Sequence, residues 1–174
     1  VNATGAAAMA YGFGASMAAI RKGLQKTKPF PMRMQLQNWR KIGIINDAYN
    51  ANPASMEAAV KTLAGIACRG ERIAILGDMF ELGRQSRQQH LQLGKQVARA
   101  GIDRLYLLGA QAGNVRQGAL VGGMAAERIV IGRGHAEVAK LLRSHVSKGD
   151  WLLFKGSRGM KMEMVLDKFK SAKA

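Results

Sequence analysis

The chain has 174 residues, enough for one complete domain and part of a second, and 48% of them are hydrophobic. No apolar run approaches the ~20 residues that a membrane helix requires. The N-terminus lacks the basic and apolar segments of a secretory signal. The single cysteine, Cys68, excludes an internal disulfide and fits a reducing compartment, so we expect a cytoplasmic protein. We expect Cys68 to pack on the apolar face of a helix.

The charge is strongly positive, because 27 lysines and arginines face 11 acidic residues and leave a net charge of +16. Such a balance favours polyanionic partners, among them nucleic acid, anionic lipid and phosphorylated substrates. Aromatic residues make up only 6% and no nucleic-acid motif stands out, so a solvated basic surface explains most of these side chains better. A non-catalytic basic α/β domain that binds nucleic acid remains an alternative, which salt-dependent DNA binding would favour.

The first forty residues form no strand-helix alternation. Residues 2–10 and 16–25 have helical patterns, residues 28–31 contain two prolines and predict an extended linker, and residues 34–38 alternate like an edge strand. Two helices with no sheet to cover are typical of the end of a preceding domain. We therefore expect residues 1–30 to be a fragment of one domain and residues 31–174 to form another, within a larger protein.

From there on, strand and helix patterns alternate. Short apolar runs, typical of strands buried on both faces, lie at residues 41–46, 72–77, 104–109, 128–131 and 151–155. Helical patterns lie at residues 54–68, 86–101, 111–121, 138–146 and 160–169, the third of which is interrupted by Gly113 and Gly118. This order predicts the α/β class, with a doubly wound, mostly parallel sheet and right-handed crossovers.

Two polar loops follow strands of this sheet. Residues 46–53 read Asn-Asp-Ala-Tyr-Asn-Ala-Asn-Pro, and residues 155–160 read Lys-Gly-Ser-Arg-Gly-Met. Open α/β sheets bind ligands at the carboxyl ends of their strands. We predict that the segments around Tyr49 and Ser157 meet at one edge of the sheet and form a common pocket.

The first loop offers carboxylate and amide groups. Asp47 suits ribose hydroxyls or a metal-bound water, or else an Asx-turn or helix cap. Asn50 and Asn52 suit a peptide or carboxylate, although Asn52 before Pro53 is better explained as a helix N-cap. Tyr49 is either a wall of the site or part of the core.

The second loop is cationic. Lys155, Ser157 and Arg158 lie near a predicted helix N-terminus, where backbone donors and the helix dipole favour an anion such as a carboxylate. A charged surface loop is the other interpretation. The sequence has no phosphate loop of the Gly-x-x-x-x-Gly-Lys-Ser/Thr type and no Gly-x-Gly-x-x-Gly after a strand, and its three histidines lack zinc-site spacing.

Taken together, these segments resemble the Mur ligase family. The likeness runs in order along essentially the whole chain, and it rests on residues 2–8, 31–34, 46–56, 77–83 and 155–163. The Tyr-Asn-Ala-Asn-Pro and Lys-Gly-Ser-Arg elements are its specific parts. The chain departs from the family pattern at five positions, where it has Gly5, Met32, Asn46, Ala48 and Lys161; Met32 and Lys161 stand where the family has glycine or another small residue.

The resemblance implies a three-domain enzyme. Residues 1–30 would be the last helices of its central ATP-binding domain, and residues 31–174 its Rossmann-like C-terminal domain. Such an enzyme uses ATP and Mg²⁺, bound mainly by the central domain, to phosphorylate the carboxylate of UDP-N-acetylmuramoyl-tripeptide, and the amine of D-alanyl-D-alanine then attacks the acyl phosphate. A Mur-type ligase with a different amine substrate is a further alternative. Without the phosphate loop we expect this chain alone to be inactive.

The resemblance also implies roles for single residues. Asn2, Arg33 and Asp47 would contact the adenine side, the phosphates and the ribose of the nucleotide. The residues toward the incoming dipeptide would be Tyr49, Asn50, Asn52, Lys155, Ser157 and Arg158. It assigns no catalytic residue and no metal ligand to this chain, and implies the N-terminal and central domains as partners, with no membrane or nucleic-acid partner.

Overall fold

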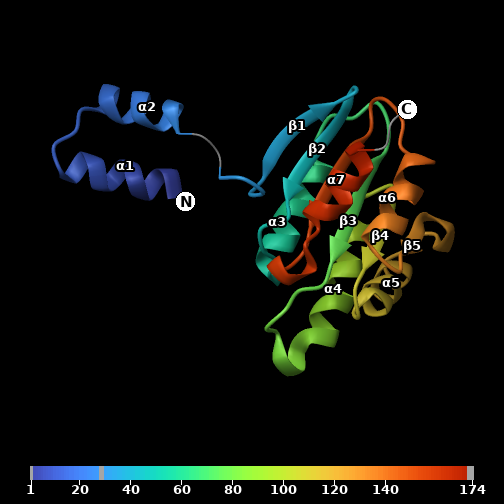
Figure 1. Ribbon diagram of the computed structural model, residues 1–174. Coiled ribbons are helices and arrows are strands. Elements are labelled where there is room, and N and C mark those ends of the chain that lie inside the picture. The colour runs from blue at the N-terminus through green and yellow to red at the C-terminus, as the bar shows by residue number, and fades with distance from the viewer. Residues whose placement is uncertain (1, 28–29, 172–174) are drawn as a thin grey trace. The chain divides into compact units, whose positions relative to one another are not determined.

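The computed structural model describes residues 2–27 and 30–171 and divides the chain into two compact units, Val1–Phe30 and Pro31–Ala174. The first unit consists of two helices, α1 (Asn2–Gly12) and α2 (Met17–Lys26) (Figure 1). The predicted linker at residues 28 and 29 lies outside the described residues. Within the second unit, a sheet alternates with helices along the chain.

The sheet has six strands in the order β1-β2-β6-β3-β4-β5. Strand β1 pairs with β2 antiparallel at one edge, and all other neighbours pair in parallel. This arrangement confirms the predicted mostly parallel α/β sheet. The strands are β1 (Gln35–Trp39), β2 (Ile42–Asp47), β3 (Arg72–Gly77), β4 (Arg104–Leu108), β5 (Ile129–Ile131) and β6 (Trp151–Lys155).

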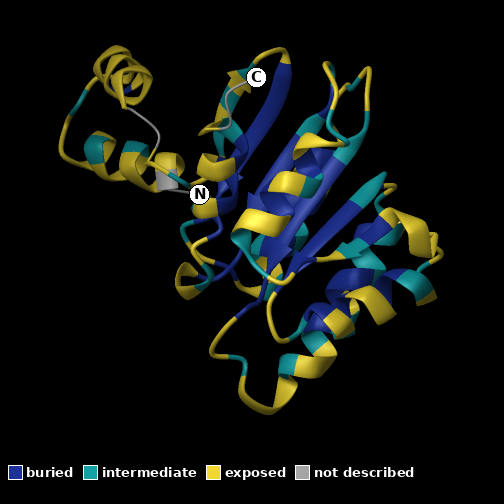
Figure 2. Ribbon diagram, turned by 45° about the vertical axis from the view of Figure 1, so that its right-hand side comes forward, coloured by how far each residue is buried: buried dark blue, intermediate teal, exposed yellow. Residues whose placement is uncertain are grey.

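Helices cover both faces of the sheet. Alternate strand residues such as Ile45 and Leu76 pack on one face with the first three helices of the unit, and Ile44 and Ile75 pack on the other face with the last two. The four central strands, β2, β6, β3 and β4, are consequently buried along most of their length (Figure 2). The helices are α3 (Pro53–Ala64), α4 (Ser86–Arg99) and α5 (Ala112–Val121) on the first face, and α6 (His135–Arg143) and α7 (Glu163–Ser171) on the second.

Three predicted helices differ from the structure by three or more residues. Helix α6 covers His135–Arg143 rather than residues 138–146. Helix α3 ends at Ala64, so Cys68 lies in the following loop rather than on a helix face, with its Sγ 3.2 Å from the carbonyl oxygens of both Gly70 and Gly149. Helix α7 begins at Glu163 rather than near residue 160, because a 3₁₀ turn and then Lys161, at φ 48°, precede it. A residue in the left-handed region cannot continue a right-handed helix.

One of the two glycines that interrupt the third helical pattern, Gly118, has a packing role. Helices α4 and α5 cross so closely that a Cβ on Gly94 would lie 2.0 Å from the Val115 carbonyl oxygen, and one on Gly118 would lie 1.9 Å from that of Leu91. Gly118 therefore strengthens this part of the fold, although it lowers the helix propensity of the segment.

We predict that Gly118→Ala destabilises the second unit by about 1–3 kcal/mol, because the added methyl group overpacks the helix crossing. Gly113→Ala on the same helix is the matched control, since a Cβ at residue 113 would meet nothing within 4 Å and the residue is exposed. It should gain up to ~1 kcal/mol from helix propensity. Urea unfolding followed by tryptophan fluorescence measures both; equal stability of the two variants would contradict the tight crossing.

The amino edge of the sheet carries a charged network around Glu71. His145 Nε2 lies 2.8 Å and Arg104 Nε 3.3 Å from Glu71 Oε2, and Arg128 Nη1 lies 3.8 Å from Oε1. Burial disfavours the charged carboxylate, but the hydrogen bonds from His145 and Arg104 outweigh it and hold the pKa of Glu71 below its ordinary value of 4.5. The network lies at the end of the sheet opposite to the polar loops.

This network gives a pH prediction. Between the folded pKa of Glu71 and 4.5 the unfolded chain binds more protons, so stability falls as the pH drops through that window. We expect Glu71→Gln to be less stable than the wild type near neutral pH and to lose less of its stability below pH 4.5. Denaturant midpoints across this pH range provide the measurement. Glu127→Gln is the control, because it removes the same charge from an exposed side chain and so shows the effect of net charge alone. Parallel pH profiles for wild type and Glu71→Gln would refute it.

Candidate functional site

The two polar loops lie together at the carboxyl edge of the sheet, where its parallel strands end, as predicted. Strands β2 and β6 are parallel neighbours, and their pairing register places Asp47 beside Lys155. The chain leaves β2 toward α3 on one face and leaves β6 toward α7 on the other. Loops that diverge in this way open a crevice at the carboxyl edge, which is the usual ligand site of open α/β sheets.

A buried ion pair fixes this edge. Lys155 is only 2% exposed, and its Nζ donates to Asp47 Oδ2 at 2.5 Å and to the Asn50 carbonyl oxygen at 2.9 Å. Asp47 Oδ1 accepts a third bond, at 2.9 Å, from the Met34 backbone N–H. One carboxylate and one ammonium therefore tie together the end of β2, the end of β6 and the segment before β1.

Ser157 links three loops. Its Oγ donates to the Ala51 carbonyl oxygen at 3.3 Å and accepts from the Phe80 N–H at 2.8 Å, while its own N–H donates to the Asp78 carbonyl oxygen at 2.9 Å. The Asp78 carboxylate in turn accepts two backbone N–H groups at the start of α5. Ser157 is 3% exposed, so these contacts position the loops rather than leave its hydroxyl open to solvent.

The edge contains two hollows, which share residues 50–52. The first has a volume of about 410 Å³ and is lined by Arg33, Met34, Asp47, Tyr49, Asn50, Ala51, Asn52, Ser55, Ala58, Ala59, Thr62 and Lys155. The second has a volume of about 390 Å³ and is lined by Asn50, Ala51, Asn52, Phe80, Glu81, Leu82, Ser157, Arg158 and Gly159.

The predicted common pocket around Tyr49 and Ser157 is therefore wrong in one respect. Tyr49 lines the first hollow and Ser157 the second, although both belong to the same edge. The physical reason is the bond from Ser157 Oγ to the Ala51 carbonyl oxygen, which holds residues 50–52 between them as a dividing wall.

The first hollow holds a cation on an aromatic ring. The guanidinium carbon of Arg33 lies 4.3 Å from the centre of the Tyr49 ring, and the Tyr49 N–H donates to the Met32 carbonyl oxygen at 3.0 Å. Such a contact stabilises a guanidinium by about 0.5–2 kcal/mol and fixes its position. Asn2, the other residue predicted near the nucleotide, belongs to the first unit, and its side chain is outside the described residues.

The amides of the dividing wall present mainly donors. Asn50 Oδ1 accepts from the Ala51 N–H at 2.9 Å. Asn52 Oδ1 accepts from the Ser55 N–H at 2.8 Å, and Ser55 Oγ accepts from the Asn52 N–H, so Asn52 caps α3 as predicted. Because each amide oxygen already has a partner, the NH₂ groups are what these side chains offer a ligand. Such donors suit carboxylate, carbonyl or phosphate oxygens.

Arg158 contributes the cation of the second hollow. Its Nη1 donates to Glu163 Oε1 at 2.8 Å and contacts Met32 Sδ at 3.6 Å, and its side chain is 53% exposed. A guanidinium has five N–H donors. Glu163 therefore orients Arg158 and leaves other N–H groups able to bind an anion.

The departures from the family pattern at residues 32 and 161 have a backbone consequence. Met32 adopts φ 59° and Lys161 φ 48°. Glycine occupies this left-handed region without steric cost, whereas a residue with a Cβ is strained there. The backbone thus keeps the conformation that a glycine would favour, and the sequence places larger side chains on it.

Several lining residues were not predicted as ligand contacts. Phe80 and Leu82 lie in a loop without helix or strand, and Ser55 and Thr62 look like ordinary surface residues of α3. A Cβ on Gly159 would lie 2.7 Å from the Phe80 ring, so the ring rests against that glycine. The sequence signal that could have indicated Phe80 was the segment at residues 77–83, Gly-Asp-Met-Phe-Glu-Leu-Gly, which belongs to the resemblance to the family.

In the described ranges 2–27 and 30–171, no group of three or more His, Cys, Asp or Glu side chains is arranged to hold a metal ion. The Asp47 carboxylate, which lines the first hollow, is bonded to Lys155 instead. None of the helices described is long and apolar enough to cross a bilayer.

The comparisons with known proteins agree with this architecture. Residues 32–158 match the family model described as "Mur ligase, glutamate ligase domain". The chain belongs to the Mur ligase family. This Mur ligase chain is 34% identical over 167 residues to the UDP-N-acetylmuramoyl-tripeptide–D-alanyl-D-alanine ligase of Bacillus subtilis, with 95% of this chain and 36% of the relative covered.

Solved Mur ligase structures share the fold. A crystal structure of MurF from Acinetobacter baumannii superposes with a TM-score of 0.86 and 31% identity, covering 98% of this chain and 37% of that one. MurF ligase from Thermotoga maritima in complex with ADP gives a TM-score of 0.78 and 26% identity, covering 94% and 35%. The chain thus spans little more than a third of the length of these relatives.

The buried ion pair gives a stability prediction for this Mur ligase chain. Lys155→Met leaves the Asp47 carboxylate buried without its ammonium partner and should cost about 3–5 kcal/mol. The double variant Asp47→Asn/Lys155→Met should lose less than the sum of the two single variants, because it leaves no unpaired charge. Urea unfolding followed by tryptophan fluorescence reports on this unit, since Trp39 and Trp151 both lie in it.

Lys61→Met provides the control for that prediction. Lys61 pairs with Glu57 on the surface of α3, and its side chain is 72% exposed. Losing an exposed pair of this kind should cost much less than losing the buried pair, because solvent screens it. If Lys155→Met cost no more than Lys61→Met, the buried pair would not be what holds the edge together.

Proposed function

We propose that this chain is the C-terminal part of an ATP-dependent amide ligase of the cytoplasm, which joins D-alanyl-D-alanine to UDP-N-acetylmuramoyl-tripeptide in peptidoglycan precursor synthesis. The observation that carries the proposal is the pair of adjoining hollows at one sheet edge, each with its own arginine. Its match along 95% of this chain to a relative of that name supports the choice of substrates.

The first hollow suits a nucleotide. The Arg33 guanidinium, fixed on Tyr49, offers donors to phosphate oxygens. Asp47 accepts from Lys155 and from the Met34 N–H, and a carboxylate has further lone pairs for ribose hydroxyls. A MurF ligase has been solved in complex with ADP, which supports nucleotide binding in the parent enzyme.

The second hollow suits the incoming dipeptide. Arg158 and the NH₂ groups of Asn50 and Asn52 are donors, and the carboxylate of D-alanyl-D-alanine is an acceptor that they can bind. Because the two hollows share the wall at residues 50–52, a nucleotide and a dipeptide bound in them would be neighbours. A dipeptide held beside the place where the tripeptide carboxylate is phosphorylated reaches the acyl phosphate without a separate encounter, which lowers the entropic part of the barrier.

In this scheme the protein binds and orients, and ATP supplies the phosphoryl group that activates the tripeptide carboxylate. The described residues do not fit a Mg²⁺ site, because no acidic cluster lies at this edge. We therefore assign Mg²⁺ and the phosphate loop to the central domain of the full-length enzyme, and expect no ligation by this chain alone.

The first unit fits a role as the end of that central domain. Its large apolar side chains are exposed: Met9 is 67%, Tyr11 66%, Phe13 89% and Met17 67% accessible. Apolar surface of this kind is normally covered by protein. The remainder of the central domain is the partner that we propose for it. No feature of the described residues favours the nucleic-acid alternative.

The proposal predicts a separation of kinetic effects in the full-length ligase. Arg33→Ala should raise the KM for ATP about tenfold or more and leave the KM for D-alanyl-D-alanine nearly unchanged, because a charged hydrogen bond contributes about 1.5–3 kcal/mol. Arg158→Ala should do the reverse. Steady-state phosphate release with each substrate varied in turn measures both constants.

Each variant serves as the control for the other, since both remove one exposed guanidinium from the same edge. If both arginine variants raised the same KM, the two hollows would not be separate sites. If neither KM changed, the proposed assignment of substrates to this edge would fail.

A further inference from the structure

One wall of the second hollow is a loop between β3 and α4. Phe80, Glu81 and Leu82 line the hollow, and none of them belongs to a helix or strand. Glu81 adopts φ 63° and Gly83 φ 52°, so the loop turns through two left-handed positions within three residues. A Cβ-bearing residue in that region costs about 1–2 kcal/mol, which contacts elsewhere must offset.

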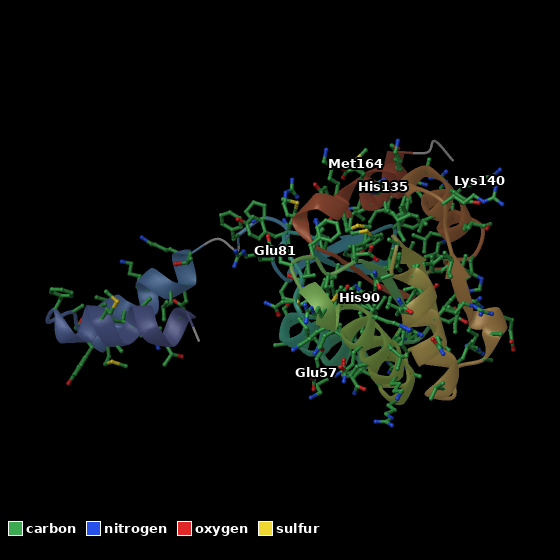
Figure 3. All side chains as sticks on the ribbon, turned by 90° about the horizontal axis from the view of Figure 1, so that it is seen from below. Glu57, Glu81, His90, His135, Lys140 and Met164 are labelled. Atoms are coloured by element: carbon green, nitrogen blue, oxygen red, sulfur yellow. The ribbon has the colours of Figure 1, made fainter. Side chains whose placement is uncertain are left out.

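A buried histidine supplies such a contact. His90 on α4 is 0% exposed, and its Nε2 lies 2.9 Å from the backbone nitrogen of Met79, which directly precedes the lining residues. Its Nδ1 lies 2.7 Å from the Ser86 carbonyl oxygen. In Figure 3 His90 lies within the body of the second unit, while Glu81 lies at its margin.

The partners define the protonation of the ring. The Met79 N–H can only donate, so Nε2 must be the acceptor. The Ser86 carbonyl oxygen can only accept, so Nδ1 carries the proton. His90 is thus a neutral imidazole in one tautomer, with both nitrogens bonded and neither directed at a ligand.

These bonds continue to the dividing wall between the hollows. His90 holds the Met79 N–H, the next residue Phe80 donates its N–H to Ser157 Oγ, and that hydroxyl donates to the Ala51 carbonyl oxygen. The side chain of a helix residue is therefore connected, through three hydrogen bonds, to both sides of the second hollow.

We propose that His90 is a positioning residue of the second hollow. Its Nε2 holds the loop of residues 79–82 in the strained conformation in which the Phe80 N–H donates to Ser157 Oγ. It touches no substrate. The identity of the affected substrate, D-alanyl-D-alanine, rests on the proposed function, whereas the effect of His90 on the loop does not.

The loop can be tested on the 174-residue chain without any activity. The wild type should show the NMR signature of an Nδ1-protonated, neutral imidazole. His90→Asn keeps a polar group near the Nδ1 position and loses the acceptor at Nε2. In this variant, amide hydrogen exchange at Met79 and Phe80, relative to Leu105 in the core of β4, should become at least ~10-fold faster. His90→Gln, whose amide oxygen reaches toward the Nε2 position, should restore part of the protection.

Leu93→Ala is the matched control, because Leu93 is a buried residue of α4 that packs in the core. It should lower overall stability and leave the ratio of loop to core exchange unchanged, since its effect is global unfolding. An Nε2-protonated ring, or an exchange ratio that moves equally in Leu93→Ala and His90→Asn, would overturn the proposal.

In the full-length ligase, His90→Asn should raise the KM for D-alanyl-D-alanine about tenfold with the KM for ATP within about twofold of wild type, and His90→Gln should lie between. A rise in the KM for ATP instead would overturn the link to the second hollow. If the enzyme did not use D-alanyl-D-alanine, the proposed function would fail, and the exchange ratio would still decide the role of His90.

Discussion

The ion pair between Asp47 and Lys155 is the constraint on which the site depends. A buried lysine at 2% exposure is tolerable only because its ammonium is bonded to a carboxylate and a carbonyl oxygen. The same carboxylate accepts the Met34 N–H, so the pair fixes the ends of two neighbouring strands and the segment that carries Arg33. Burying these two charges is costly, but their hydrogen bonds set the positions of these three segments.

This arrangement separates residues that build the site from residues that are available to ligands. Lys155 and Ser157 are buried and have bonds in several directions, while the arginines at positions 33 and 158 are exposed. Each arginine is itself oriented, one by the Tyr49 ring and the other by Glu163. Pre-oriented cations lose less entropy on binding an anion, which is why a fixed edge suits the two anionic ligands that we propose for it.

Much of the fold followed from local pattern, because strands buried on both faces are short apolar runs and helices have capped ends. The Asn52-Pro53 start of α3 is an example, with its side-chain cap present as predicted. The errors have equally specific causes. Cys68 was placed on a helix that ends four residues earlier, at Ala64. The start of α7 was displaced by a left-handed residue, Lys161, which propensity alone does not reveal.

The sequence by itself determined the fold class, the family and the two loops that form the site, since each depends on residues close together in the chain. Only the tertiary structure decided what those residues do. Lys155 was predicted as a cation for a ligand, and its ammonium instead lies against Asp47, 108 positions away. Likewise Gly118 interrupts a helical pattern in the sequence, and only the structure shows that α4 and α5 cross there. Strand register and helix crossing set the distances between residues that are far apart in the chain, and no local stretch of sequence determines either of them.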